Sequence, residues 1–148
     1  MATLNPYLNF QGNTEEAFNF YKSVFGGEFS AIMRFKDMSG CDGPDNKMPE
    51  SDGDKIMHIS LPIGNGSILM ATDALESMGQ TLTQGNNQYI HIGVESKEEA
   101  DKFYNALSEG GKVEMPIADT FWGSYFGCTD DKFGVKWMID YTATPQNS

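Results

Sequence analysis

The chain has 148 residues, a length that suits one domain or two small fused modules. Hydrophobic residues make up 39% and aromatic residues 12%, a globular composition that excludes a disordered chain. The formal net charge is −11 and no basic stripe is present, so we expect no nucleic-acid partner and no membrane partner. We also expect a cytoplasmic protein with free thiols, because the N-terminus lacks a secretory signal and two cysteines make no disulfide framework.

The first elements in the chain are a strand and a helix. The segment 6–13 is expected to form a strand that enters a helix over 13–27. Asn13 is the expected N-cap, with Glu16 completing a capping box, and Gly26-Gly27 is the expected stop. The helix would bury one apolar stripe, whose residues are spaced by three and four positions: Ala17, Phe20, Tyr21 and Val24.

A polar segment and two further strands follow. The segment 37–54 is rich in aspartate and turn residues, and we interpret it as an acidic surface loop with a potential role as a lid. The spacing of its acidic residues does not match that of a calcium-binding loop. The segments 55–64 and 66–73 predict a hairpin, and 76–88 is the expected link to the rest of the chain.

The second half repeats the first. Between 13–24 and 96–107, five of twelve positions are identical at an offset of 83. The segments 89–96 and 134–141 match the first and last strands of the first half, and 122–131 is a further strand. This internal repeat predicts an α+β fold in which two βαβββ modules, 1–80 and 85–148, form one domain over 1–148 with a cupped mixed sheet.

Three phrases of the sequence carry a family resemblance: FYKSVFGGE, HISLPIGNGSILMATDA and DTFWGSYFGCTDDKFGVKWMID. With the two-module pattern, they resemble the PhnB-like branch of the glyoxalase, bleomycin resistance and dioxygenase (vicinal-oxygen-chelate) superfamily. That branch is often described as 3-demethylubiquinone-9 3-methyltransferase-like. The resemblance covers nearly the whole chain, and it implies a site inside the cup and a homodimer.

The methyltransferase description meets a physical objection. A nucleotide-type cofactor normally binds a glycine-rich turn between a strand and a helix. The close glycine pair here, Gly64-Asn65-Gly66, leads from one strand into another. We therefore do not expect S-adenosylmethionine as a cofactor.

The resemblance also implies where a metal would be bound. Catalytic members of the superfamily carry His, Gln or Glu ligands on the first and last strands of the modules. When the helix of each module is aligned with the corresponding helix of the family, these positions fall on Pro6, Met70, Tyr89 and Met138. Proline cannot ligate a metal and thioethers are poor ligands for hard divalent ions, so no metal is expected at these positions.

Two histidines, His58 and His91, remain as candidate catalytic residues. Strand alternation places His91 on the same face as Tyr89, which is expected to be the cup. Three roles stay open for the histidines: hydrogen-bonded pocket or core residues, general bases, or ligands of a displaced divalent metal that also uses a carboxylate.

The remaining pocket candidates are aromatic and thioether side chains that would offer flat or adaptable apolar surface. With the histidines they make up the expected ligand pocket: His58, Met70, Thr72, Tyr89, His91, Trp122, Tyr125 and Met138. Asp73 and Asp140 are interpreted as solvated strand-end residues, and Cys128 as structural, because Asp130 and Asp131 oppose its ionisation.

These observations favour a protein that binds a small, partly apolar molecule without a metal. The alternative is an enzyme with lyase or isomerase chemistry that uses His58 or His91. A third interpretation is a structural dimer whose cups are filled by their own side chains.

Overall fold

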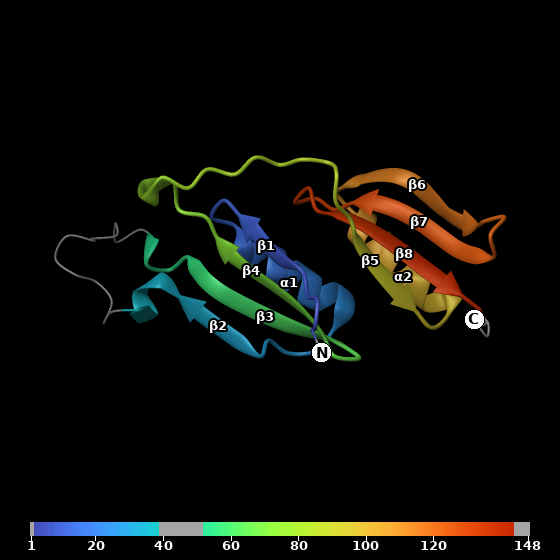
Figure 1. Cartoon of the computed structure of the whole chain (residues 1–148), viewed down its shortest axis with the longest axis horizontal. Helices are drawn as coiled ribbons and strands as arrows, with labels where there is room; N and C mark the ends of the chain where they lie inside the picture. Colours follow the sequence, from blue (N-terminus) through green and yellow to red (C-terminus); the bar gives the residue numbers. More distant parts are fainter. Residues whose placement is uncertain (1, 39–51, 144–148) are drawn as a thin grey trace. The chain divides into compact units, whose positions relative to one another are not determined.

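The computed structural model describes residues 2–38 and 52–143. The chain divides into two compact units, Met1–Thr83 and Gln84–Ser148, and each contains one four-stranded mixed sheet and one long helix (Figure 1). The α+β architecture of two βαβββ modules is therefore confirmed. Most of the acidic loop expected over 37–54, with Cys41, lies outside the described residues.

The first unit follows the order strand, helix, three strands. Its elements are β1 (Tyr7–Phe10), α1 (Thr14–Phe25), β2 (Ala31–Arg34), β3 (Ile56–Gly64) and β4 (Ser67–Asp73), with the short 3-10 helices η1 (Phe35–Met38) and η3 (Glu76–Met78). The sheet order is β1-β4-β3-β2, with β1 parallel to β4 and the other pairs antiparallel. The hairpin turn between β3 and β4 has the expected left-handed residues, Asn65 at φ 51° and Gly66 at φ 83°.

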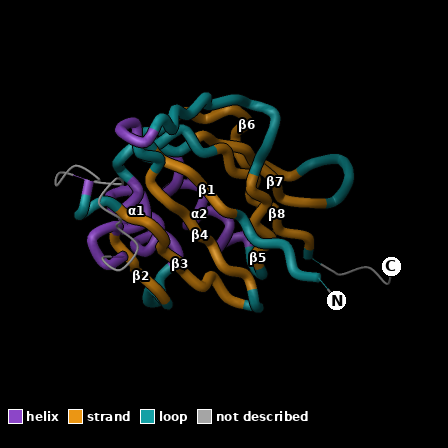
Figure 2. Tube along the Cα trace, turned by 60° about the vertical axis from the view of Figure 1, so that its left-hand side comes forward, coloured by secondary structure: helices purple, strands orange, loops and turns teal. Residues whose placement is uncertain are grey.

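Helix α1 covers one face of this sheet (Figure 2). Its fully buried apolar side chains include Ala17, Phe18 and Tyr21, which lie against the Ile59 and Ala71 side of the strands. Phe18 takes the place that the sequence pattern gave to Phe20, which is only half-buried. The stripe is therefore shifted around the helix by part of a turn.

The start of α1 differs from the expected capping box. Asn13 makes no side-chain cap hydrogen bond. The buried carboxylate of Asp73 takes over: its Oδ1 accepts from the Thr14 backbone N–H (3.0 Å) and hydroxyl (2.6 Å), and its Oδ2 accepts from the Ile56 N–H (2.8 Å). The interpretation of Asp73 as a solvated strand end is therefore wrong, because this side chain ties β4, α1 and β3 together.

The second unit repeats the order with tighter loops. Its elements are β5 (Ile90–Val94), α2 (Lys97–Ser108), β6 (Lys112–Asp119), β7 (Ser124–Asp130) and β8 (Lys136–Thr142), and the sheet order is β5-β8-β7-β6. Ser96 caps α2 as expected, by accepting from the Glu99 N–H at 3.0 Å. The Glu99 carboxylate accepts in turn from the Glu95 N–H at 3.0 Å.

The loop before the helix is one residue longer in the first unit than in the second. Residues 11–13 separate β1 from α1, whereas 95–96 separate β5 from α2. The strands therefore correspond at an offset of 84 while the helices correspond at 83. Tyr7 pairs with Met70, and His91 pairs with Met138. The paired residue lies one position after Pro6 in the first unit and two positions after Tyr89 in the second.

No helix in the described part of the chain is long and apolar enough to cross a membrane.

Candidate functional site

Strand alternation in the second unit divides the side chains between a face covered by α2 and the opposite face, which we call the helix-free face. Thr129 lies toward α2, where its hydroxyl accepts a hydrogen bond from Ser108 at 2.8 Å. A Cβ at Gly127 would lie 2.9 Å from Tyr104 of α2, so Gly127 also faces the helix. The intervening residue, Cys128, and its partner Met138 therefore point to the helix-free face.

A histidine and a carboxylate form one pair on this face. His91 Nε2 lies 3.1 Å from Asp140 Oδ2, and their side chains are 56% and 25% exposed. A neutral imidazole that donates from Nε2 to Asp140 keeps the Nδ1 lone pair free to accept a proton or bind a ligand. The carboxylate thus orients the ring, and the pair can act as a polar anchor or as a base.

Beside this pair lies a cluster of aromatic rings, Phe121, Trp122 and Phe126. Phe126 pairs with Asp140 across β7 and β8. The Trp122 and Phe126 centroids are 5.8 Å apart at an interplanar angle of 67°. The Phe121 and Trp122 centroids are 5.0 Å apart, with the rings edge to face. Trp122 is 55% exposed and Phe121 is 97% exposed, which is a large amount of accessible aromatic surface.

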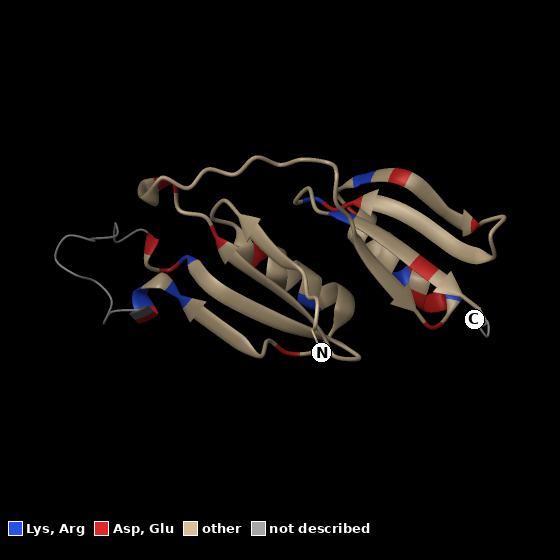
Figure 3. Ribbon diagram, viewed as in Figure 1, with Lys and Arg blue, Asp and Glu red and all other residues tan. Residues whose placement is uncertain are grey.

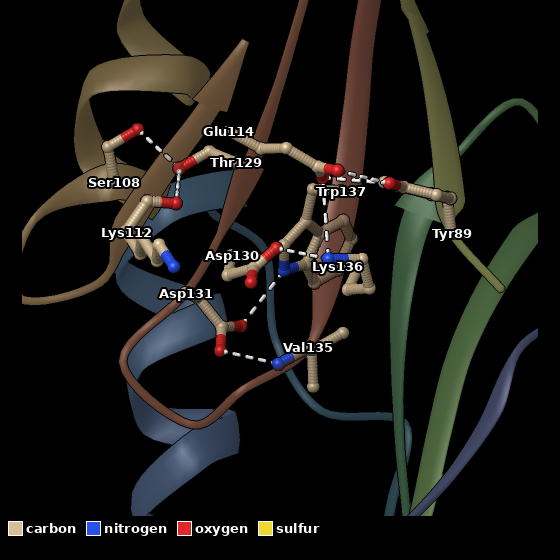
Figure 4. Close-up of polar contacts among 10 residues, drawn as sticks. All are labelled: Tyr89, Ser108, Lys112, Glu114, Thr129, Asp130, Asp131, Val135, Lys136 and Trp137. Carbon is tan, nitrogen blue, oxygen red and sulfur yellow. Dashed lines mark hydrogen bonds and ion pairs between the residues drawn. The ribbon is translucent and has the colours of Figure 1, made fainter. Parts of the chain in front are cut away.

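A charged network occupies the other end of the face (Figure 4). The Tyr89 hydroxyl lies 2.8 and 2.6 Å from the two carboxylate oxygens of Glu114. Lys136 Nζ lies 3.3 Å from Glu114 and 2.9 Å from Asp130, and 5.0 Å from the Tyr89 ring centroid. Tyr89 therefore shares a face with Lys136, Met138 and His91, as strand alternation predicted.

This network shifts the pKa values of its members. The hydrogen bond to Glu114 raises the pKa of Tyr89, and the same bond lowers the pKa of Glu114. The bond to Asp130 raises the pKa of Lys136. Lys136 also borders a shallow polar groove with residues of the unit's first loop and of the β7–β8 turn: Gln84, Gly85, Asn86, Asp130 and Gly134.

Sequence reasoning missed Glu114 and Lys136, because their pairing joins strands that are distant in the chain. It also missed Asp131, which is buried and accepts from the Trp137 indole N–H at 2.9 Å and from the Val135 N–H at 3.0 Å (Figure 4). The sequence pattern that could have indicated this role is Asp131 followed within six residues by Gly134 and Trp137.

The first unit brings together a smaller set on its own helix-free face. His58 Nδ1 lies 3.0 Å from the Tyr7 hydroxyl, and burial raises the pKa of that hydroxyl. Tyr7 pairs with Met70 across β1 and β4, and the Thr72 side chain lies two residues further along the same face. His58, Met70 and Thr72 thus gather in the first unit, whereas Tyr89, His91, Trp122 and Met138 gather in the second.

Tyr125, the remaining pocket candidate, faces α2. Its hydroxyl donates to Asp101 at 2.6 Å, and this bond raises the pKa of Tyr125 to about 12. Lys97 Nζ lies 5.0 Å from its ring centroid. The sequence placed this residue in the ligand pocket, but alternation along β7 turns it to the helix side.

Among residues 2–38 and 52–143, no group of three or more His, Cys, Asp or Glu side chains is arranged to hold a metal ion. Burial, followed by the charge of Glu114, raises the pKa of the Cys128 thiol. Figure 3 shows Lys and Arg residues interspersed with Asp and Glu along the described chain.

Comparisons with known proteins agree with this fold. The model of the glyoxalase/bleomycin resistance protein/dioxygenase superfamily matches residues 3–139. Protein YjdN of Escherichia coli (strain K12) is 33% identical over 144 residues, with 93% of each chain covered.

Two solved structures are similar over almost the whole chain. The crystal structure of protein PA1353 from Pseudomonas aeruginosa has a TM-score of 0.81 and 36% identity, covering 97% of this chain and 100% of that one. A structure described as a putative 3-demethylubiquinone-9 3-methyltransferase, PhnB protein, from Bacillus cereus has a TM-score of 0.73 and 27% identity, covering 95% and 100%. The resemblance drawn from the sequence is confirmed.

Proposed function

Because the chain belongs to the glyoxalase/bleomycin resistance protein/dioxygenase superfamily, we propose that it binds a small, partly apolar molecule on the helix-free face of its second sheet. The observation that carries this proposal is the half-exposed Trp122, packed on Phe126 directly beside the His91–Asp140 pair. A flat apolar wall with a few fixed polar groups is the usual composition of a small-molecule site. Met138 adds an adaptable thioether surface next to His91.

The two tryptophans of the chain provide the test. Trp122 is 55% exposed on the proposed site, whereas Trp137 is 1% exposed beneath the sheet. A screen of small aromatic acids, phenols and amines is expected to yield compounds that change the Trp122 fluorescence and stabilise the protein against heat. A ligand at 100 times its Kd adds about 2.7 kcal/mol to the free energy of unfolding.

The variant Trp122→Phe is expected to weaken binding of a compound found in this way. The matched variant Tyr125→Phe, on the α2 side of β7, leaves binding unchanged. Equal weakening by both variants, or by neither, would refute this location of the site.

A second candidate function is an enzyme with lyase or isomerase chemistry, and the His91–Asp140 pair favours it. A carboxylate that orients an imidazole is a common arrangement for a general base. If His91 is the base, His91→Gln lowers turnover by about 10²–10⁴-fold, whereas in a binding protein it costs only modest affinity. His58→Gln tests the other histidine in the same assay.

The protein is further proposed to act as a cytoplasmic homodimer that requires neither a divalent metal nor S-adenosylmethionine. The free, buried Cys128 is compatible with a reducing compartment. Native mass spectrometry of protein purified without added metal measures the metal content and the subunit number together. One stoichiometric divalent ion per chain would overturn the metal-independent function.

A further inference from the structure

Three soft donor atoms occupy neighbouring positions on the helix-free face of the second sheet. His91 on β5 pairs with Met138 on β8, and Met138 pairs with Cys128 on β7. Paired residues on adjacent strands point to the same side of a sheet. We propose that this row, which we call the soft-donor row, binds one soft monovalent cation of the Cu(I) class, held by the Cys128 thiolate and the Met138 thioether, with His91 beside them.

The donor chemistry selects the ion. Thiolate and thioether sulfurs prefer Cu(I) and similar soft ions, whereas carboxylate and water oxygens suit hard divalent ions. Cβ atoms of directly paired residues lie about 4.5–5.5 Å apart. This separation places the Cys128 and Met138 side chains within reach of one ion.

The burial of Cys128 favours a monovalent ion over a divalent one. Cys128 is 6% exposed, and burial opposes an uncompensated thiolate. Binding exchanges the thiol proton, which is released to the buffer, for the cation, so the pair formed by thiolate and monovalent cation is neutral.

The Asp140 carboxylate orients the His91 ring. Its Nε2 is engaged by Asp140 at 3.1 Å, which leaves Nδ1 as the free nitrogen. A carboxylate that holds the second nitrogen of a metal-binding imidazole raises its basicity and fixes its orientation. Asp140 is therefore a positioning residue for the soft-donor row.

The first unit contains the matched control. The equivalent row there is Tyr7, Met70 and Ser60, in the same strand pairing. It keeps the central methionine but replaces the imidazole by a phenol and the thiol by a hydroxyl. The two rows therefore differ in the donors on either side of a shared thioether.

The test uses Ag(I) as a redox-inert probe and Cu(I) in competition with a chromophoric Cu(I) chelator. All proteins carry Cys41→Ser, because Cys41 is the other thiol of the chain. We expect one Ag(I) per chain by native mass spectrometry and one Cu(I) withdrawn from the chelator. Cys128→Ser should lower the affinity by at least about 100-fold, since changes outside the direct ligands already cost about 10–100-fold.

Met138→Leu conserves volume and should also weaken binding, whereas Met70→Leu should not. Met138→Leu keeps the test informative if Cys128→Ser fails to fold, which circular dichroism would reveal. Binding that is equal in Met138→Leu and Met70→Leu, or no binding to the Cys41→Ser protein, would overturn the proposal. The organic-ligand site and the soft-donor row share His91 and Met138, but the two assays use different probes, so failure of the ligand screen does not affect the Ag(I) and Cu(I) result.

Discussion

Replacing Asp73 by alanine is expected to destabilise the first unit strongly. The carboxylate is 3% exposed and accepts three hydrogen bonds, from the Thr14 N–H, the Thr14 hydroxyl and the Ile56 N–H. Alanine would leave two backbone donors without their partner in a site that water does not reach.

The magnitude follows from the cost of unsatisfied buried groups, about 1–3 kcal/mol each. With two backbone donors unpaired and the carboxylate volume lost, we expect Asp73→Ala to reduce the free energy of unfolding by about 4 kcal/mol. For a protein of this size, that corresponds to a fall of about 10 °C in Tm.

Urea unfolding followed by far-ultraviolet circular dichroism is the appropriate assay. Both tryptophans lie in the second unit, so fluorescence alone would not report on the site. Asp119→Ala is the control, because this side chain is 73% exposed and its loss should cost less than about 0.5 kcal/mol. A loss below about 1 kcal/mol in Asp73→Ala would refute the role of Asp73 as the anchor of α1.

Three further predictions concern single elements. Ser96→Ala should cost about 1 kcal/mol in urea unfolding, because Ser96 caps α2, whereas Asn13→Ala, which removes no cap hydrogen bond from α1, should cost little. Gly127→Ala should destabilise the second unit by about 1–3 kcal/mol or more in the same assay, because the new Cβ would lie 2.7 Å from the Ile117 Cα. Tyr125 should titrate with a pKa of about 12 in the difference between the tyrosinate absorbance curves of the wild type and Tyr125→Phe.

The raised pKa of Tyr125 also determines how its hydrogen bond contributes to stability at different pH values. The pKa of Tyr125 is raised above its unfolded value of about 10, so the hydrogen bond stabilises the fold fully below that pH. The contribution is lost as the pH rises through about 12. Titration of Tyr125 near the normal phenol pKa of about 10 would contradict the Tyr125–Asp101 bond. Equal losses of stability in Ser96→Ala and Asn13→Ala would contradict the assignment of Ser96 as the cap. An unchanged free energy of unfolding in Gly127→Ala would contradict the close packing of Gly127 against β6.

The architecture could be predicted from the sequence because it rests on short-range signals that occur twice. The apolar stripes, the double-glycine stops and the turn at Asn65-Gly66 each act within a few residues of chain. The internal repeat then indicated that the two halves of the chain are two copies of the same module. The helix-free position of His91 also followed from simple alternation along a strand.

The details that escaped prediction depend on contacts between distant residues or on loop length. The loop before α1 has one residue more than the loop before α2, so the strands of the two units correspond at a different offset from the helices. The Thr14 N–H at the start of α1 bonds to Asp73, and not to the expected cap Asn13. Asp73 is 59 residues away in the chain, so no local sequence pattern could indicate it. Likewise, the side of the sheet on which Tyr125 lies depends on the register of β7 against β8, which the sequence alone did not define.

The most direct test of the central claim is a ¹H–¹⁵N correlation spectrum recorded during titration with a compound from the ligand screen. The proposed site predicts that the indole N–H signal of Trp122 shifts in step with binding, with the amides around His91 and Asp140. The Trp137 indole N–H, which is bonded to Asp131 beneath the sheet, should stay in place and serves as the internal control. Shifts confined to the Trp137 side or to the first unit would show that the helix-free face of the second sheet is not the binding site.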